Sequence, residues 1–182
     1  MHLIARQITR RLPEYEEISR TLTEAFPKEQ LIPIWQLRLL AKLRRGNNFT
    51  AYYDSKHFAG LSFTAENSDA VFVLYLAVNA KLRSKGYGSQ ILQQIMDQAG
   101  ARPVILDVEE ENDRAINAQQ RVRRKDFYRK HGFITTGYVL EEGGERFEIL
   151  VTSTSCDVGV YRQLLQLLSF GFYRPRIVAA KT

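Results

Sequence analysis

Residues Leu74 to Ala99, LYLAVNAKLRSKGYGSQILQQIMDQA, decide the fold. The stretch begins as an apolar run typical of a buried strand, passes through a basic turn with two glycines, and ends in a helical pattern. One face of that helix is apolar: Ile91, Leu92, Ile95, Met96 and Ala99. A strand, a glycine-containing turn and a helix in this order aim backbone N–H groups and a helix N-terminus at one point, which makes an anion site.

The turn at residues 83–88, RSKGYG, narrows the kind of anion site. The dinucleotide-binding pattern G-x-G-x-x-G is excluded because Ile91 stands where its third glycine would be. A P-loop is excluded because no G-K-[ST] closes the turn. Gly86 and Gly88 allow positive φ and close backbone approach, while Arg83 and Lys85 add positive charge. The turn therefore predicts a site for an anion.

The bulk composition predicts a globular protein of one domain. The chain has 182 residues, of which 45% are hydrophobic and 25% charged. We expect one domain over residues 1–182, in which 153–182 form a C-terminal helix and tail. No apolar run is long enough to span a membrane and no signal peptide is apparent. The single Cys156 excludes an internal disulfide and indicates a cytoplasmic protein, and the three His residues have no metal-ligand spacing, so no metal is predicted.

The net charge of +6 is unevenly distributed. Residues 107–113, DVEEEND, are strongly acidic, and residues 113–130 are strongly basic. An excess of positive charge is compatible with binding to nucleic acid, to an anionic surface or to a polyphosphate ligand. The adjacent blocks suit a site that binds an anion and a cation, although both also fit the solvated faces of a loop and a helix.

The order of expected elements is β-α-α-β-β-β-α-β-α-β-β followed by a C-terminal helix, which is a mixed α/β fold. Strands are expected at 3–9, 49–53, 57–65, 70–79, 103–109, 133–140 and 146–152. Helices are expected at 13–25, 30–45, 115–130 and 157–169. A further helix is expected to run from the end of the glycine-containing turn to residue 99. The aromatic and basic tail, residues 170–182, is expected to pack on the body or on a second subunit, as in a homodimer.

In this context the chain resembles the GNAT superfamily of N-acetyltransferases. The superfamily's acetyl-CoA signature, Q/R-x-x-G-x-G/A, is matched by Arg83, Gly86 and Gly88. Three further motifs resemble the family's L-[DE]-V, N-x-x-A-I and [FL]-Y-x-x-x-G-F: Leu106-Asp107-Val108, then Asn112 with Ala115 and Ile116, then Phe127-Tyr128 with Gly132-Phe133. One departure is that sixteen positions separate Asn112 from Tyr128, where the family usually has one or two helical turns.

The resemblance implies a GNAT-like fold, with a central, mostly antiparallel sheet of about seven strands flanked by helices. It also implies acetyl-CoA as the acyl donor, without a metal, and an amine as the acceptor. The implied cofactor-binding residues are Leu76, Ala77, Val78, Arg83, Ser84, Lys85, Gly86, Tyr87, Gly88, Ser89 and Asn112. The implied catalytic residues are Asp107 or Glu109 as the base that takes the amine proton and Tyr128 as the proton donor to the leaving thiolate.

Two other functions stay open from the sequence. One is a GNAT-like protein that binds CoA as a sensor without turnover. The other is a nucleic-acid-binding protein that uses the basic helix and tail, although no base-reading motif is present. Asp107 as a structural hydrogen-bonding residue and Tyr128 as a core aromatic also stay open. The acceptor is not identified by any motif.

Overall fold

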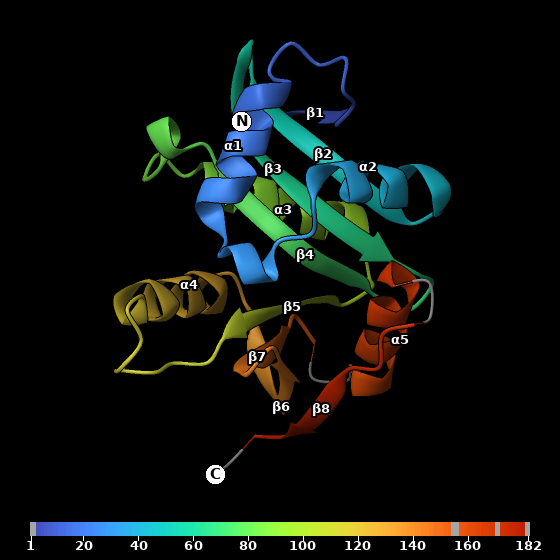
Figure 1. Cartoon of the computed structure of the whole chain (residues 1–182), viewed down its shortest axis with the longest axis vertical. Helices are drawn as coiled ribbons and strands as arrows, with labels where there is room; N and C mark the ends of the chain where they lie inside the picture. The colour runs from blue at the N-terminus through green and yellow to red at the C-terminus, as the bar shows by residue number, and fades with distance from the viewer. Residues whose placement is uncertain (1–2, 154–156, 170–171, 181–182) are drawn as a thin grey trace. The chain divides into compact units, whose positions relative to one another are not determined.

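The computed structural model describes residues 3–153, 157–169 and 172–180, which form two compact units (Figure 1). The first unit is Met1–Glu66 with Val73–Gly100, and the second is Asn67–Phe72 with Ala101–Thr182. Strand β4 (Val71–Val78) begins in the second unit and continues in the first. The strands are hydrogen-bonded in the order β1-β2-β3-β4-β5-β7-β6-β8. The predicted mixed α/β, mostly antiparallel fold is confirmed, whereas the single domain over 1–182 stays a prediction.

The first unit is built on a meander whose strands carry buried aromatic and aliphatic side chains. β1 (Ile4–Gln7) pairs antiparallel with β2 (Asn47–Asp54), and β2 pairs antiparallel with β3 (His57–Glu66). Nearly every residue of β3 is buried, so this strand lies inside the unit. Helices α1 (Tyr15–Ala25) and α2 (Ile34–Leu43) lie on one face of these strands, and α3 (Tyr87–Ala99) lies on the other (Figure 1).

The second predicted helix is shorter than the sequence pattern indicates. The pattern predicts a helix over residues 30–45, but a 3-10 turn, η1 (Lys28–Gln30), comes first and α2 starts only at Ile34. The reason is Pro33, because a proline disfavours helical backbone in the residue before it. The N–H of Ile32 instead donates to the Tyr75 hydroxyl at 3.0 Å, and that hydroxyl donates to the Gln30 carbonyl.

The second unit is a four-stranded sheet covered by two helices. β5 (Val104–Glu109) pairs antiparallel with β7 (Glu145–Val151), which pairs antiparallel with β6 (Ile134–Glu142). The first residues of β4, Val71 and Phe72, run parallel to β5. Helix α4 (Ala118–Lys130) packs on β5, and the amphipathic helix α5 (Val158–Leu168) buries Tyr161, Leu164, Leu165 and Leu168.

Two further predictions need correction in this unit. Helix α4 begins at Ala118 rather than 115, because residues 112–117 form turns in which the Asn112 side chain accepts the N–H of Arg114. The sequence pattern predicts no strand in the tail, yet β8 (Arg176–Ala179) pairs antiparallel with β6. Among the described residues the sheet therefore has eight strands rather than seven. Cys156 lies outside the described residues.

Candidate functional site

The turn that carries the predicted anion site is fixed at its start by Asn79. The Asn79 amide donates to the Phe58 carbonyl and to Glu17 Oε1, both at 3.0 Å. Its side-chain oxygen accepts the N–H of Lys81 at 3.2 Å and so caps the short 3-10 helix η2 (Ala80–Leu82). Three elements of the first unit therefore determine where the chain leaves β4 and enters the turn.

Gly86 determines how the chain enters α3. It has φ +81°, in the left-handed region, and it precedes the helix as its N-cap residue. A Cβ placed on Gly86 would meet no atom within 4 Å, so the space beside it is open. As a glycine, Gly86 has no side chain with which to cap the N-terminus of α3. The first-turn N–H groups, at Tyr87, Gly88 and Ser89, have no carbonyl within the helix to bind, and the helix dipole favours an anion there.

The side chains around this turn carry positive charge into solvent. Arg83, Ser84 and Lys85 are exposed, and the first turn of α3 contains no acidic residue. Tyr87 is different, because its hydroxyl donates to Asp54 Oδ2 at 2.7 Å and is thereby tied to the end of β2. The hydroxyl of Tyr87 thus positions the start of α3, while its backbone N–H lies in the first turn of the helix.

The strand before the turn is packed closely against its neighbour. Of the three predicted residues in it, Ala77 is buried, whereas Leu76 and Val78 are half-buried. A Cβ on Gly60 of β3 would lie 2.5 Å from the Ala77 carbonyl oxygen and 2.8 Å from Cδ1 of Ile91. Only glycine fits at residue 60, so the sequence places β3, β4 and α3 in close contact. The sequence prediction did not include this role of Gly60, although a glycine inside a strand pattern is its signal.

Asp107 lies on β5 in the second unit and is half-buried. Its Oδ2 accepts a hydrogen bond of 2.6 Å from the hydroxyl of Tyr161 on α5. Burial raises the pKa of Asp107 to about 6, the hydrogen bond from Tyr161 opposes that rise, and the charge of Glu142 adds to it. A carboxyl group with this pKa exchanges a proton near neutral pH. The partner Tyr161 was not predicted, since a tyrosine on an amphipathic helix is typical of a core residue.

Tyr128 is buried on α4 among other aromatic rings. Its ring centroid lies 5.1 Å from that of Phe127 and 5.6 Å from that of Phe133. Burial raises the pKa of its hydroxyl to about 12, which the charge of Arg124 lowers and that of Asp107 raises. The hydroxyl is thus protonated at neutral pH, as a proton donor must be. The burial also supports the core-aromatic interpretation.

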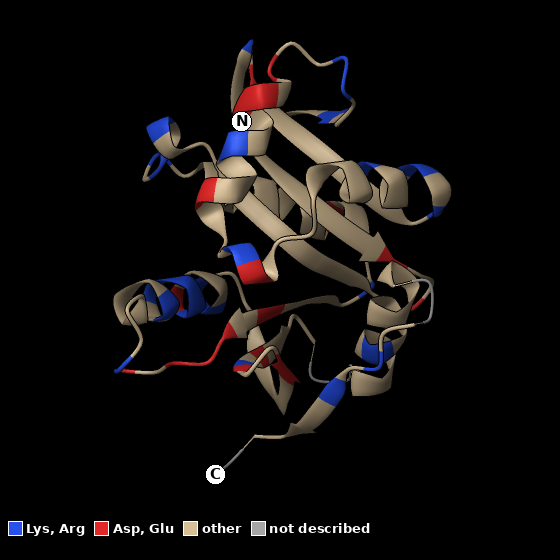
Figure 2. Ribbon diagram, in the orientation of Figure 1, with Lys and Arg blue, Asp and Glu red and all other residues tan. Residues whose placement is uncertain are grey.

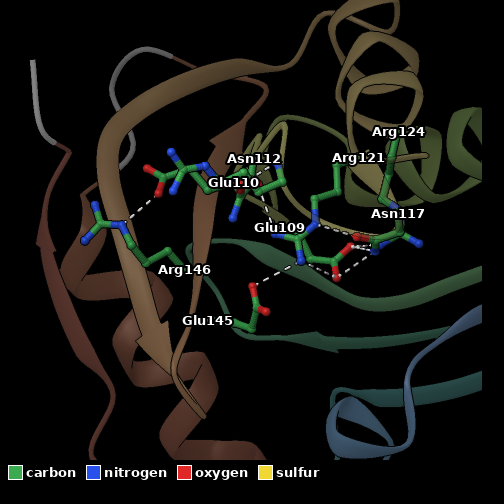
Figure 3. Close-up of polar contacts among 9 residues, drawn as sticks. Glu109, Glu110, Asn112, Asn117, Arg121, Arg124, Glu145 and Arg146 are labelled. Atoms are coloured by element: carbon green, nitrogen blue, oxygen red, sulfur yellow. Dashed lines mark hydrogen bonds and ion pairs between the residues drawn. The ribbon is translucent and has the colours of Figure 1, made fainter. Parts of the chain in front are cut away.

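Glu109, the second predicted base, is held in a buried polar cluster (Figure 3). Its carboxylate accepts from the Asn117 amide at 3.2 and 3.3 Å and pairs with Arg124 at 3.3 Å. The buried guanidinium of Arg121 lies 3.6 Å from the same carboxylate. Because Glu109 is 3% exposed and both of its oxygens are engaged, Asp107 is the better placed of the two for proton transfer.

Arg121 joins this cluster to the turn of the β6–β7 hairpin. Its Nε donates to Asn117 Oδ1 at 2.8 Å, one Nη to the Glu110 carbonyl at 3.1 Å, and the other to Glu145 Oε2 at 3.1 Å. The basic block of the sequence is therefore not simply a solvated face. Figure 2 shows Lys and Arg positions along much of α4, and of these Arg123, Arg129 and Lys130 are exposed. The signal for Arg121 in the sequence was weak, since one arginine among several gives no indication of burial.

Asn112 lies apart from the anion site in the sequence and belongs to the second unit. It is exposed in the loop before α4 and lines a polar pocket of about 590 Å³, together with Glu110, Arg121, Glu145 and Arg146. Arg146 donates to Glu110 and to Glu141, both at 2.7 Å. The structure gives Asn112 no contact beyond its own turn that would assign it to a cofactor.

Within residues 3–153, 157–169 and 172–180, no group of three or more His, Cys, Asp or Glu side chains is arranged to hold a metal ion. In the same part of the chain, no helix has the length and apolarity needed to cross a membrane. Several acidic side chains of the second unit are instead engaged by arginine and lysine.

Comparison with known proteins gives a family match over most of the chain. The sequence model of the family described as "Acetyltransferase (GNAT) family" matches residues 14–133. This range contains the turn at 83–89 as well as Asp107 and Tyr128, and it ends before α5. No curated protein sequence matches the chain.

Solved structures share the fold. A protein from Bacteroides thetaiotaomicron described as a GNAT-family acetyltransferase matches with TM-score 0.75 and 23% identity, over 93% of this chain and 99% of its own. A GNAT acetyltransferase from Elizabethkingia anophelis, solved with acetyl-CoA bound, matches with TM-score 0.56 and 14% identity, over 84% and 98%. The aminoglycoside 6'-N-acetyltransferase from Enterococcus faecium matches with TM-score 0.61 and 13% identity, over 85% and 98%.

Proposed function

The chain belongs to the acetyltransferase (GNAT) family of acyltransferases, and on that premise we propose that it transfers an acetyl group from acetyl-CoA to a primary amine. The amine attacks the thioester directly within a ternary complex. Binding both reactants side by side supplies much of the rate gain, because it replaces a bimolecular encounter by a positioned one.

The observation that carries the proposal is the uncapped N-terminus of α3 behind the left-handed Gly86. The residues present fit a pyrophosphate, since the turn offers backbone N–H groups, exposed Arg83 and Lys85, and open space beside Gly86. We assign the backbone of residues 83–89 to the pyrophosphate and that of 76–78 to the pantetheine arm. When bound, acetyl-CoA supplies the activated acyl group.

Asp107 is assigned as the base. An alkyl amine has a pKa of about 10 and is mostly protonated at neutral pH, so it must lose a proton before it attacks. With a pKa of about 6, the Asp107 carboxyl is mostly ionised at pH 7 and still basic enough to take that proton, directly or through water. Glu109 fits better as the centre of the buried ion-pair cluster, because two arginines and an asparagine engage it.

Tyr128 is assigned as the proton donor to the leaving thiolate. Its raised pKa keeps the hydroxyl protonated at neutral pH, so a proton is available to the sulfur as the carbon–sulfur bond breaks. The backbone N–H of Val78 is assigned to polarise the acyl carbonyl.

The alternative within the same family is a protein that binds CoA without turnover. It is favoured by the burial of Tyr128, which also suits a core aromatic residue. The two functions differ in one observable, the release of free CoA thiol in the presence of an amine.

The experiment that tests the proposal follows thiol release from acetyl-CoA against a panel of primary amines, from polyamines and aminoglycosides to peptides with free N-termini. The proposal expects amine-dependent release with at least one member and a large loss of kcat in Asp107→Asn. CoA binding without release on every amine would support the alternative. A steeply salt-dependent affinity for DNA or RNA without CoA binding would instead indicate a nucleic-acid-binding protein.

A further inference from the structure

The contact between Tyr161 and Asp107 brings an element from beyond the family match to the proposed base. The family match ends at residue 133, and α5 begins at Val158. Both residues lie in the second unit, so their contact is set within one compact body. The Tyr161 hydroxyl and Asp107 Oδ2 are 2.6 Å apart, the short distance typical of a hydrogen bond to a charged acceptor.

The position of Tyr161 is fixed by its ring. The side chain is fully buried, and the ring packs edge-to-face on Phe72 with centroids 5.2 Å apart and planes at 78°. Phe72 pairs with Ile105 in the parallel register between β4 and β5, two residues before Asp107. The same strand pair thus carries both the carboxylate and the ring that holds its hydrogen-bond donor.

The hydroxyl of Tyr161 engages one oxygen of the carboxylate and leaves the other available. Asp107 Oδ2 accepts the hydrogen bond, the side chain is half-buried, and no hydrogen bond to Oδ1 is found in the described part of the chain. A carboxylate that is anchored through one oxygen has a defined orientation, and the second oxygen retains its lone pairs for an incoming proton.

We propose that Tyr161 is the positioning residue of the acetyl transfer, whose hydroxyl holds the Asp107 carboxylate in the orientation from which it takes the amine proton. This inference rests on the proposed function, in which Asp107 is the base. It makes the C-terminal helix part of the proton-transfer machinery, although the helix lies outside the matched family region.

Four titratable groups surround Asp107 in the second unit. Tyr161 on α5 donates to the carboxylate and lowers its pKa, while the charge of Glu142 on β6 raises it. Tyr128 on α4 and Tyr173 after α5 both respond to the charge of Asp107, which raises the pKa of each. Tyr161 is the only one of these four described groups with a hydrogen bond to the carboxylate.

The inference is tested with Tyr161→Phe, which removes the hydroxyl and keeps the ring. The carboxylate then loses the donor that stabilises its charged form, so its pKa rises. In a plot of kcat/KM against pH, we expect the midpoint of the acidic limb to move to higher pH by about 1 unit. We also expect kcat to fall by a larger factor than the factor by which KM changes. The carboxyl carbon signal of Asp107, identified by its absence in Asp107→Asn, is expected to show the same upward shift by NMR titration.

The matched control is Tyr52→Phe. Tyr52 is also buried, and its hydroxyl contacts Ser62 at 3.0 Å within the first unit, whereas Asp107 belongs to the second. We expect this variant to leave the acidic limb in place. If Tyr161→Phe does not fold, Phe72→Leu loosens the ring of Tyr161 and is expected to shift the midpoint in the same direction by a smaller amount.

The results of these measurements distinguish a failure of the positioning role of Tyr161 from a failure of the proposed acetyl transfer. A folded Tyr161→Phe with an unshifted Asp107 midpoint and the wild-type pH profile overturns the inference, while acetyl transfer by the wild type still supports the function. If no amine releases thiol, the proposed function fails, and the positioning role with it, even where the NMR midpoint shifts. An upward shift in both readouts supports the positioning role.

Discussion

Arg121 and Glu145 are 24 positions apart and lie 3.1 Å from each other, between Nη2 and Oε2. Arg121 is 6% exposed, so its guanidinium is a buried charge compensated by Glu109 and Glu145. Through the Glu110 carbonyl and Asn117 it also fixes the loop before α4. One side chain therefore connects β5, α4 and the β6–β7 hairpin.

Replacing Arg121 by methionine is expected to destabilise the protein strongly. The change removes a guanidinium that compensates the buried Glu109 carboxylate, and breaking a buried pair by removing one partner costs about 3–5 kcal/mol. Denaturant unfolding measures the loss. Arg123→Met, on an exposed position of the same helix, is expected to change stability by less than about 0.5 kcal/mol. Equal stability of the two variants would show that the cluster carries no stability.

Arg121→Lys is a second test of the same cluster. Lysine keeps the charge but has no planar guanidinium to reach Asn117, the Glu110 carbonyl and Glu145 together. We expect it to recover only part of the lost stability. Full recovery in the unfolding experiment would mean that charge alone, rather than the fork of donors, matters here.

Gly60→Ala is expected to disturb β4 at the assigned pantetheine segment. The new Cβ would lie 2.5 Å from the Ala77 carbonyl oxygen and 3.2 Å from Cα of Val78, so backbone has to move. Overpacking of this kind costs about 1–3 kcal/mol. The affinity for CoA, measured by titration calorimetry, is expected to fall along with stability. A variant with wild-type CoA affinity would contradict the assignment of residues 76–78.

Asp107→Asn is expected to stabilise the fold at neutral pH while it removes the base. The folded-state pKa of Asp107 is raised from 3.8 to about 6, so the folded protein binds the extra proton between these values and the wild type loses stability as pH rises through that window. Asparagine avoids this cost. We expect the variant to be more stable by about 1–3 kcal/mol at pH 7.5, and the two proteins to converge near pH 4.

The measurement is urea unfolding of both proteins from pH 4 to 8, with thiol release assayed at pH 7.5. A variant that is less stable than the wild type at every pH would mean that Asp107 is held for structural reasons. If the variant is more stable than the wild type but inactive, Asp107 is a functional residue whose presence lowers the stability of the fold.

The sequence predicted most of the fold because the strong patterns are local. The predicted strand at 57–65, the turn at 83–88 and the helix to Ala99 all correspond to observed elements, β3, the turn and α3. The predicted start of α2 was wrong because the restriction that Pro33 places on Ile32 outweighs the periodicity that continues through residue 31. β8 was missed because a four-residue edge strand has too few residues to show a period.

The candidate site was predictable in part, and for the same reason. Gly86 is a local signal, since a glycine that follows a basic turn and opens a helix is typical of an anion site. The hydrogen bond from Tyr161 to Asp107 spans 54 positions, and the burial of Arg121 depends on Glu145 from another hairpin. Such contacts arise from tertiary packing, which single-sequence patterns do not encode.

The most direct test of a pyrophosphate site at the N-terminus of α3 compares the CoA affinity of Gly86→Asn with that of Gly86→Asp. The two side chains have nearly the same size, and asparagine and aspartate both tolerate the left-handed backbone better than other residues do. They differ by one negative charge at the helix N-terminus, so the ratio of their affinities reports whether an anion binds there.

We predict that Gly86→Asn retains measurable binding of CoA, and that Gly86→Asp binds at least about tenfold more weakly at low salt, with the ratio shrinking as salt is added. Equal CoA affinity of the two variants would contradict the placement of the pyrophosphate at residues 83–89, and with it the assignment of this turn as the donor site.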